Sequence, residues 1–263
     1  MAKMAPNARE ADGTVGKALA VLDQIAEAGR PMRFGEVLAI SDHPKATLYR
    51  LVQTLTNQGM LSYDDTQQTY APGLRLVRLA HAAWRQSALA PVARPCLDQL
   101  SADVGETIHL AQLDRGQVLY VDKRNAETPI EMFSQAGKIG PGYCTGVGKA
   151  MIAYLSAEAQ ADAIRRQAFF AHTPQTLSTP EALMAELAEI RRDGVAFDRE
   201  EHEPGIICIA VPILSAAGKV MGGLSITSSR QRQSLDALSN LRPALVKAAQ
   251  EIATAAETWQ FPS

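Results

Sequence analysis

Residues 43–59 read HPKATLYRLVQTLTNQG, and this stretch decides how the first third of the chain folds. Pro44 suits the first turn of a helix, and Gly59 suits its end. Apolar residues between them recur at helical spacing, which predicts a helix over residues 44–58 with one buried stripe. That stripe consists of Leu48, Leu51, Val52 and Leu55.

The opposite face of this helix is rich in hydrogen-bond donors near its N-terminal end, the end that enters a major groove in helix-turn-helix proteins. Lys45 and the helix N-terminus can also meet phosphate. The alternative is an ordinary solvated face on a core helix, but the neighbouring elements favour DNA reading. The candidate DNA-contacting residues are Lys45, Thr47, Tyr49, Arg50 and Gln53.

The neighbouring segments predict a winged helix-turn-helix. Residues 14–28 and 33–39 read as helices, and residues 60–63 and 69–71 read as a hairpin. Three helices followed by a hairpin within about 60 residues is the layout of that fold. A connecting helix over residues 73–87 follows, and Pro91 and Pro95 are expected to mark its exit.

The charge of this region is modest. Residues 1–85 hold ten Lys and Arg against eight Asp and Glu, and the hairpin tip is acidic at Asp64 and Asp65. An acidic tip repels phosphate. Tight binding to DNA would therefore need two copies of the DNA-contacting helix, which predicts a dimer on a repeated site.

Beyond Pro95 the pattern changes to strands mixed with helices, which predicts an α+β domain around an antiparallel sheet. The expected strands are residues 107–113, 118–122, 130–134, 206–214 and 220–227. The expected helices are residues 97–104, 146–155, 181–193 and 235–258, the last interrupted near Pro243. The predicted organisation is a disordered leader (1–13), a winged helix-turn-helix (14–72), a linker helix (73–93) and a C-terminal domain (94–263).

Polar groups cluster near glycines in this second part. Ser225 and Thr227 lie two apart on a predicted strand and so share a face. The helix start after Thr145 contains Gly146 and exposes backbone N–H groups that suit a carboxylate. Residues 198–205, DREEHEPG, form a charged loop before the strand with Cys208. Each of these features has an alternative to a binding role. The charged loop could be a solvated turn, His109 a core histidine, and Cys208 a small buried apolar residue.

The amino-acid composition excludes several classes of protein. The chain has 263 residues, 46% hydrophobic content and a net charge of −2, so it is globular and not uniformly basic. It lacks a long uncharged apolar run, and its first residues lack a signal-peptide core, which predicts no membrane span and a cytoplasmic location. Three scattered cysteines exclude a disulfide framework.

Six segments over about residues 14–256 have a shared pattern: TVGKALAVLDQIAEAG, PKATLYRLVQTLTNQGML, YAPGLRLVRLA, ETIHLAQLDRGQVLYVDKR, YCTGVGKAMIAYL and DREEHEPGIICIAVPILSAAGKVMGGLSIT. Together they resemble the IclR-type bacterial transcription regulators. The subgroup that controls sugar-acid catabolism, such as regulators of 2-keto-3-deoxygluconate use, looks most similar. Pro44, where the family often has a serine cap, and the acidic wing are departures that leave the operator open.

The resemblance implies a winged helix-turn-helix, a linker helix and a GAF-like effector domain, without a cofactor or a resident metal. It implies a repressor of a catabolic operon that binds double-stranded operator DNA as a homodimer or dimer of dimers. The linker helix would carry the response to a small carboxylate effector. The effector-binding residues it implies are Gly146, Val147, Asp198, Cys208, Ser225 and Thr227, with Met132, Tyr143 and Thr145 as looser matches.

Two other classes of function are open from the residues alone. Cys144, Cys208, His109 and Asp198 could hold zinc or sense redox state if they converge. Cys208 could act as an enzyme nucleophile with His109 or His202 as its base.

Overall fold

The computed structural model describes residues 13–86 and 89–258. The chain forms two compact units that divide between Arg85 and Gln86. The expected leader falls on residues 1–12, which lie outside the described residues, and on Gly13, which is exposed.

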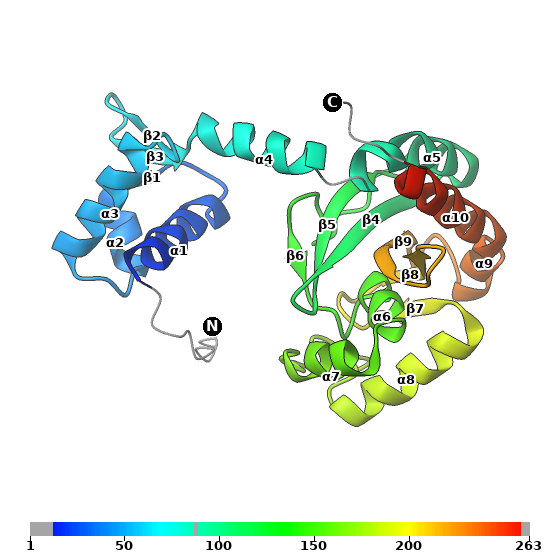
Figure 1. Ribbon diagram of the computed structural model, residues 1–263. Coiled ribbons are helices and arrows are strands. Elements are labelled where there is room, and N and C mark those ends of the chain that lie inside the picture. The colour runs from blue at the N-terminus through cyan, green and yellow to red at the C-terminus, as the bar shows by residue number, and fades with distance from the viewer. Residues whose placement is uncertain (1–12, 87–88, 259–263) are drawn as a thin grey trace. The chain divides into compact units, whose positions relative to one another are not determined.

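The N-terminal unit confirms the predicted winged helix-turn-helix (Figure 1). The four buried residues of α3 are those of the predicted stripe, and they pack with α1, α2 and the hairpin in one apolar core. A short strand before α2 adds to the hairpin, giving an antiparallel sheet of order β1-β3-β2. The elements are α1 (Thr14–Glu27), β1 (Met32–Arg33), α2 (Phe34–Ile40), α3 (Lys45–Asn57), β2 (Leu61–Asp64), β3 (Thr69–Pro72) and α4 (Leu74–Gln86).

The acidic wing tip has a structural role. The Oδ1 atom of Asp64 accepts backbone hydrogen bonds from Thr66 at 2.8 Å and Gln67 at 3.0 Å. An Asp side chain that bonds the backbone two and three residues on closes a tight turn. The carboxylate of Asp64 therefore stabilises the turn, although its negative charge disfavours binding of a DNA phosphate at the wing tip.

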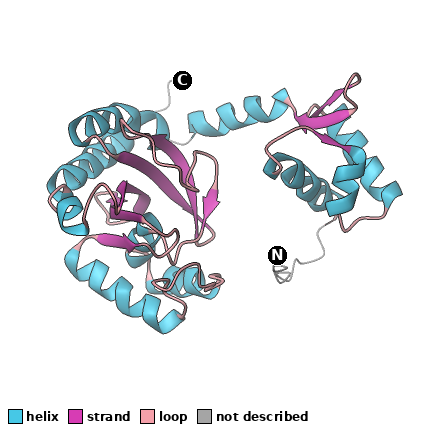
Figure 2. Ribbon diagram, turned by 180° about the vertical axis from the view of Figure 1, so that it is seen from behind, coloured by secondary structure: helices cyan, strands magenta, loops and turns pink. Residues whose placement is uncertain are grey.

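The C-terminal unit confirms the predicted α+β class. Its antiparallel sheet has the order β6-β5-β4-β9-β8-β7. Helices α5 and α10 pack together on one face, and α6 covers the other, with α7 and α8 behind it (Figures 1 and 2). The strands are β4 (Thr107–Asp114), β5 (Gln117–Arg124), β6 (Ile139–Gly140), β7 (Ala196–Arg199), β8 (Ile206–Leu214) and β9 (Val220–Ser229). The helices are α5 (Leu89–Val104), α6 (Gly146–Ala153), α7 (Ala157–Arg165), α8 (Pro180–Asp193), α9 (Leu235–Ser239) and α10 (Arg242–Thr258).

The prediction that Pro91 and Pro95 mark a helix exit is wrong, because both lie within α5. Pro91 falls in the first turn, where a backbone N–H has no partner within the helix. Pro95 lies inside the helix, where a proline lowers the stability of the helix. The stripe of Leu89, Ala90, Ala93, Leu97 and Leu100 is buried, and that burial outweighs the cost of the proline.

The expected strand over residues 130–134 is also wrong, and the strand that pairs with β5 is β6. The segment makes polar contacts in place of a ladder: the Phe133 N–H donates to both oxygens of Glu203 at 3.0 Å. The expected break near Pro243 is confirmed, since α9 and α10 flank it. No helix in the described ranges is long and apolar enough to cross a membrane.

Candidate effector pocket and DNA-reading helix

Helix α3 presents its polar face outward. Lys45, Tyr49 and Arg50 are exposed, with 54% of the Tyr49 surface accessible, whereas Thr47 and Gln53 are half-buried. Tyr49 packs edge-on against Phe34, with ring centroids 5.8 Å apart. Lys45, Tyr49 and Arg50 are therefore accessible to a ligand, whereas Thr47 and Gln53 are only partly so.

The inner face of the C-terminal sheet carries a row of polar side chains. Strand register pairs Thr107 with Thr227, Thr227 with Cys208, and Cys208 with Asp198. The adjacent row pairs His109 with Ser225. Paired residues in neighbouring strands project to the same face. Residues from four separate segments of sequence thus share one surface. We call this surface the polar row, and it consists of Thr107, Thr227, Cys208, Asp198, His109 and Ser225.

A pocket lies over the polar row. It has about 400 Å³ of empty space, part of which is open solvent. No described residue that lines it is a Lys or an Arg. The lining residues are His109, Tyr120, Met132, Ser134, Thr145, Gly146, Val147, Asp198, His202, Glu203, Ile206, Cys208, Ser225 and Thr227.

Eight of the nine effector residues named from the sequence line this pocket, and Tyr143 does not. Tyr143 is buried nearby and donates its hydroxyl to the Phe170 carbonyl at 2.6 Å. The sequence pattern does not identify five further lining residues as effector contacts, and it leaves His109 open between a core and a binding role. The five are Tyr120, Ser134, His202, Glu203 and Ile206. Strand alternation with Thr107 was the available signal for His109, but Ser134 lies on a loop whose position depends on tertiary contacts.

Helix α6 points its N-terminus into the pocket. Its N-cap residue, Thr145, donates its hydroxyl to the Pro141 carbonyl at 2.7 Å and does not cap the helix amides. A Cβ atom on Gly146 would lie 2.4 Å from the Cys208 sulfur, so the helix approaches β8 this closely only with glycine. The first N–H groups of α6 therefore lie against the polar row, where they favour an anion.

Asp198 is an acidic residue that lines the pocket together with that helix start. Its side chain is buried, and Oδ1 accepts the Glu201 N–H at 2.8 Å. Burial, followed by the charge of Glu201, raises the pKa of Asp198 to about 7. Its carboxyl group therefore exists in both protonation states near neutral pH, and it can donate as well as accept a hydrogen bond.

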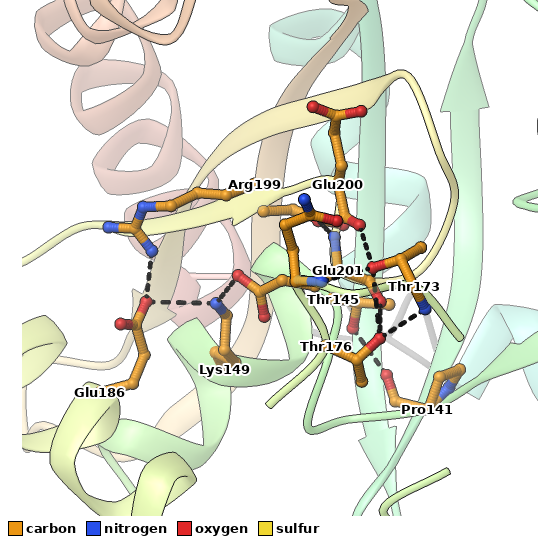
Figure 3. Close-up of polar contacts among 11 residues, drawn as sticks. Pro141, Thr145, Lys149, Thr173, Thr176, Glu186, Arg199, Glu200 and Glu201 are labelled. Carbon is orange, nitrogen blue, oxygen red and sulfur yellow. Dashed lines mark hydrogen bonds and ion pairs between the residues drawn. The ribbon is translucent and has the colours of Figure 1, made fainter. Parts of the chain in front are cut away.

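A buried ion-pair network lies behind the pocket (Figure 3). The Nζ atom of Lys149, fully buried on α6, lies 2.5 Å from Glu201 Oε1 and 3.2 Å from Glu186 Oε1 on α8. Arg199 reaches the same Glu186 oxygen at 2.8 Å. Breaking such a pair by removing one partner typically costs 3–5 kcal/mol. The network therefore ties α6 to the segment that carries Asp198.

Residues 198–205 form a strap beside the pocket, and not the solvated turn that the sequence allowed. Its first two residues, Asp198 and Arg199, are the last two of strand β7 (Ala196–Arg199). Thr173 and Thr176 donate hydroxyls to the carbonyls of Glu200 and Glu201, each at 2.6 Å (Figure 3). These bonds to the backbone, together with the side-chain contacts of Asp198 and Glu201, fix the course of the strap, which a pattern of acidic residues alone does not reveal.

The cysteines do not support the zinc or enzyme hypotheses. Burial raises the pKa of both the Cys144 and the Cys208 thiol, so neither is poised as a thiolate. No group of three or more His, Cys, Asp or Glu within the described ranges is arranged to hold a metal ion. Cys208 packs against Gly146 as part of the pocket wall.

Comparisons with known proteins match most of the chain. Residues 14–65 match the IclR helix-turn-helix domain, and residues 81–254 match the C-terminal domain of the bacterial transcriptional regulator IclR. The chain belongs to the IclR family. Its members are transcriptional regulators and not enzymes, so the Cys208 nucleophile hypothesis does not hold.

Individual proteins similar to this IclR-family regulator support the assignment. The HTH-type transcriptional regulator XynR of Escherichia coli K12 is 31% identical, over 89% of this chain and 93% of XynR. The HTH-type transcriptional regulator KdgR of the same organism is 30% identical, over 83% of each chain. The crystal structure of Thermotoga maritima IclR has a TM-score of 0.74 and 27% identity, covering 92% of this chain and 98% of that one.

The raised pKa of Asp198 predicts a pH-dependent stability difference. Below pH 4 this carboxyl is protonated in both the folded and unfolded states, and between about pH 4 and 7 only the folded state keeps the proton. Stability from this group is therefore lost as pH rises. We expect Asp198→Asn to gain stability over the wild type by up to about 1.4 kcal/mol per pH unit in that window, measured by urea unfolding.

Asp162→Asn is the matched control, because Asp162 is exposed and its pKa is lowered by hydrogen bonding to Arg166. Its difference from the wild type should stay flat from pH 5 to 7. An equally flat profile for Asp198→Asn would contradict the account of Asp198.

Proposed function

We propose that this protein is an effector-responsive repressor of a catabolic operon. It would bind operator DNA through α3. It would bind a small carboxylate, which is a sugar acid or a keto acid, in the C-terminal pocket. The observation that carries the proposal is the pocket itself, which combines free helix amides, hydroxyls and a titratable Asp198 in one unit of a DNA-binding regulator.

The DNA contacts would come from the exposed residues of α3. Arg50 would reach base edges with Thr47, while Lys45 and the start of the helix would meet phosphate. Pro44 precedes the helix and offers no capping oxygen, which leaves the first amides available to an anion. The short reach and acidic tip of the wing make α3 the main contact.

A homodimer would supply the second reading head. On α4, Leu74 and Val77 are 86% and 52% exposed, and on α1, Val15 is 74% exposed. Exposed apolar residues in several positions of one small unit suit association with a second copy. Two α3 helices would then read a pseudo-palindromic site, and two such dimers could pair.

The effector would bind with its carboxylate at the N–H groups of Gly146 and Val147. Ser225, Thr227 and Asp198 would hold its hydroxyl or keto oxygens. Such binding changes DNA affinity only if it favours one arrangement of the protein over another. The linker helix α4 would transmit that preference to α3.

Arg50→Ala tests the reading helix. We expect at least a tenfold loss of affinity for the DNA upstream of the regulated gene, because a base-reading arginine contributes about 1–3 kcal/mol. A gel shift at fixed salt measures it, with Arg165→Ala as the control, since Arg165 is an exposed arginine on α7. Unchanged binding by Arg50→Ala would remove α3 as the reader.

Gly146→Ala tests the carboxylate site. The new methyl group would meet the Cys208 sulfur and push the helix start away from the polar row. We expect the thermal shift produced by sugar acids and keto acids to vanish, while DNA binding without effector persists. Gly35→Ala is the control, because a Cβ at Gly35 meets no atom within 4 Å. An undiminished thermal shift in Gly146→Ala would refute the site.

A further inference from the structure

The pocket contains an imidazole surrounded by hydroxyl groups. The Nε2 atom of His109 lies 2.7 Å from Ser134 Oγ. Its Nδ1 atom lies 3.2 Å from Thr227 Oγ1 and 3.4 Å from Ser225 Oγ. All four side chains line the pocket, and both ring nitrogens of His109 face hydroxyls that also face the ligand space.

The imidazole is neutral across the physiological range. Burial, followed by the charge of Lys123, lowers the pKa of His109 to about 3. A neutral imidazole offers one N–H and one lone pair, and it can exchange them between its two nitrogens. Each neighbouring hydroxyl can therefore donate or accept, so the wall can adapt its hydrogen bonds without changing its charge.

We propose that His109 determines the specificity of this pocket, by orienting the hydroxyls of Ser134, Ser225 and Thr227 so that they pair with hydroxyls of the effector. The effector class is accordingly a polyhydroxylated carboxylate of the aldonate type, in preference to a keto acid or an unsubstituted acid. This inference rests on the proposed effector role of the pocket.

The remaining polar groups favour the same ligand class. Asp198 and Glu203 supply acceptor oxygens at the lining, and the wall hydroxyls need partners for both their protons and their lone pairs. A ligand hydroxyl both donates and accepts, whereas a keto oxygen only accepts and an alkyl chain does neither. A site built around hydroxyl partners rejects an analogue that lacks them by as much as about 10⁴-fold, because its own buried groups are left unpaired.

Isothermal titration of the full-length protein tests this specificity. The probes are C5 and C6 aldonates including D-gluconate, with hexanoate as the six-carbon acid without hydroxyls and pyruvate as the keto acid. We expect at least one aldonate to bind at least tenfold more tightly than hexanoate and pyruvate. His109→Phe should reduce that preference to below threefold, whereas His109→Gln, which keeps a donor and an acceptor, should retain part of it.

Serine variants serve as a second test if His109→Phe does not fold. Ser134→Ala and Ser225→Ala should each weaken aldonate binding about tenfold and leave hexanoate binding unchanged. Ser228→Ala is the matched control, since Ser228 is a buried serine of β9 that projects to the opposite face and has no hydrogen-bond partner among the described residues. It should bind like the wild type.

Three results would overturn the inference. Equal or tighter binding of pyruvate or hexanoate by the wild type would leave the effector pocket in place but refute the ligand class. A tenfold preference that survives in folded His109→Phe, or in both serine variants, would remove His109 and its hydroxyls from specificity. Binding of none of these acids would refute the proposed effector class together with the inference.

Discussion

The buried ammonium of Lys149 is the constraint on which the pocket depends. A charge taken fully out of water is tolerated only beside opposite charge, so Glu201 and Glu186 must lie where they do. Fixing Glu201 fixes the strap of residues 198–205, because Asp198 is held by the Glu201 N–H. The same lysine is one turn from Gly146, so one contact sets both the acidic side of the pocket and its amide side.

In the proposed function, a cavity without Lys or Arg among its described lining residues binds an anion. The attraction would come from backbone amides at the start of α6, and the acidic Asp198 can take up a proton near neutral pH. Hydroxyls and a neutral imidazole complete the wall without adding charge. We therefore expect a ligand to be selected by the pattern of its hydrogen-bonding groups more than by its net charge.

The sequence predicted what local periodicity controls. The stripe of α3, the extent of β8 and the break before α10 follow from spacing and proline chemistry, and each is confirmed. Local pattern failed where tertiary contacts decide. Residues 130–134 alternate like a strand but bond to Glu203, and Pro95 persists within α5 because the stripe around it is buried.

The candidate site divides in the same way. Residues in recognisable motifs, such as Gly146 and Ser225, were named from sequence and lie at the pocket. Ser134 and Glu203 lie there because loops far apart in the chain converge, and no spacing rule brings them together. The role of the acidic strap also needed the structure, because its carboxylates are distinguished only by their partners.

We propose that occupancy of the C-terminal pocket changes the affinity of α3 for DNA. Fluorescence anisotropy of labelled upstream DNA, titrated with protein in the absence and presence of saturating effector, measures this coupling directly. We expect at least a fivefold change in Kd for DNA, the lower end of typical allosteric coupling. An identical Kd, with the effector shown to be bound under the same conditions, would contradict it.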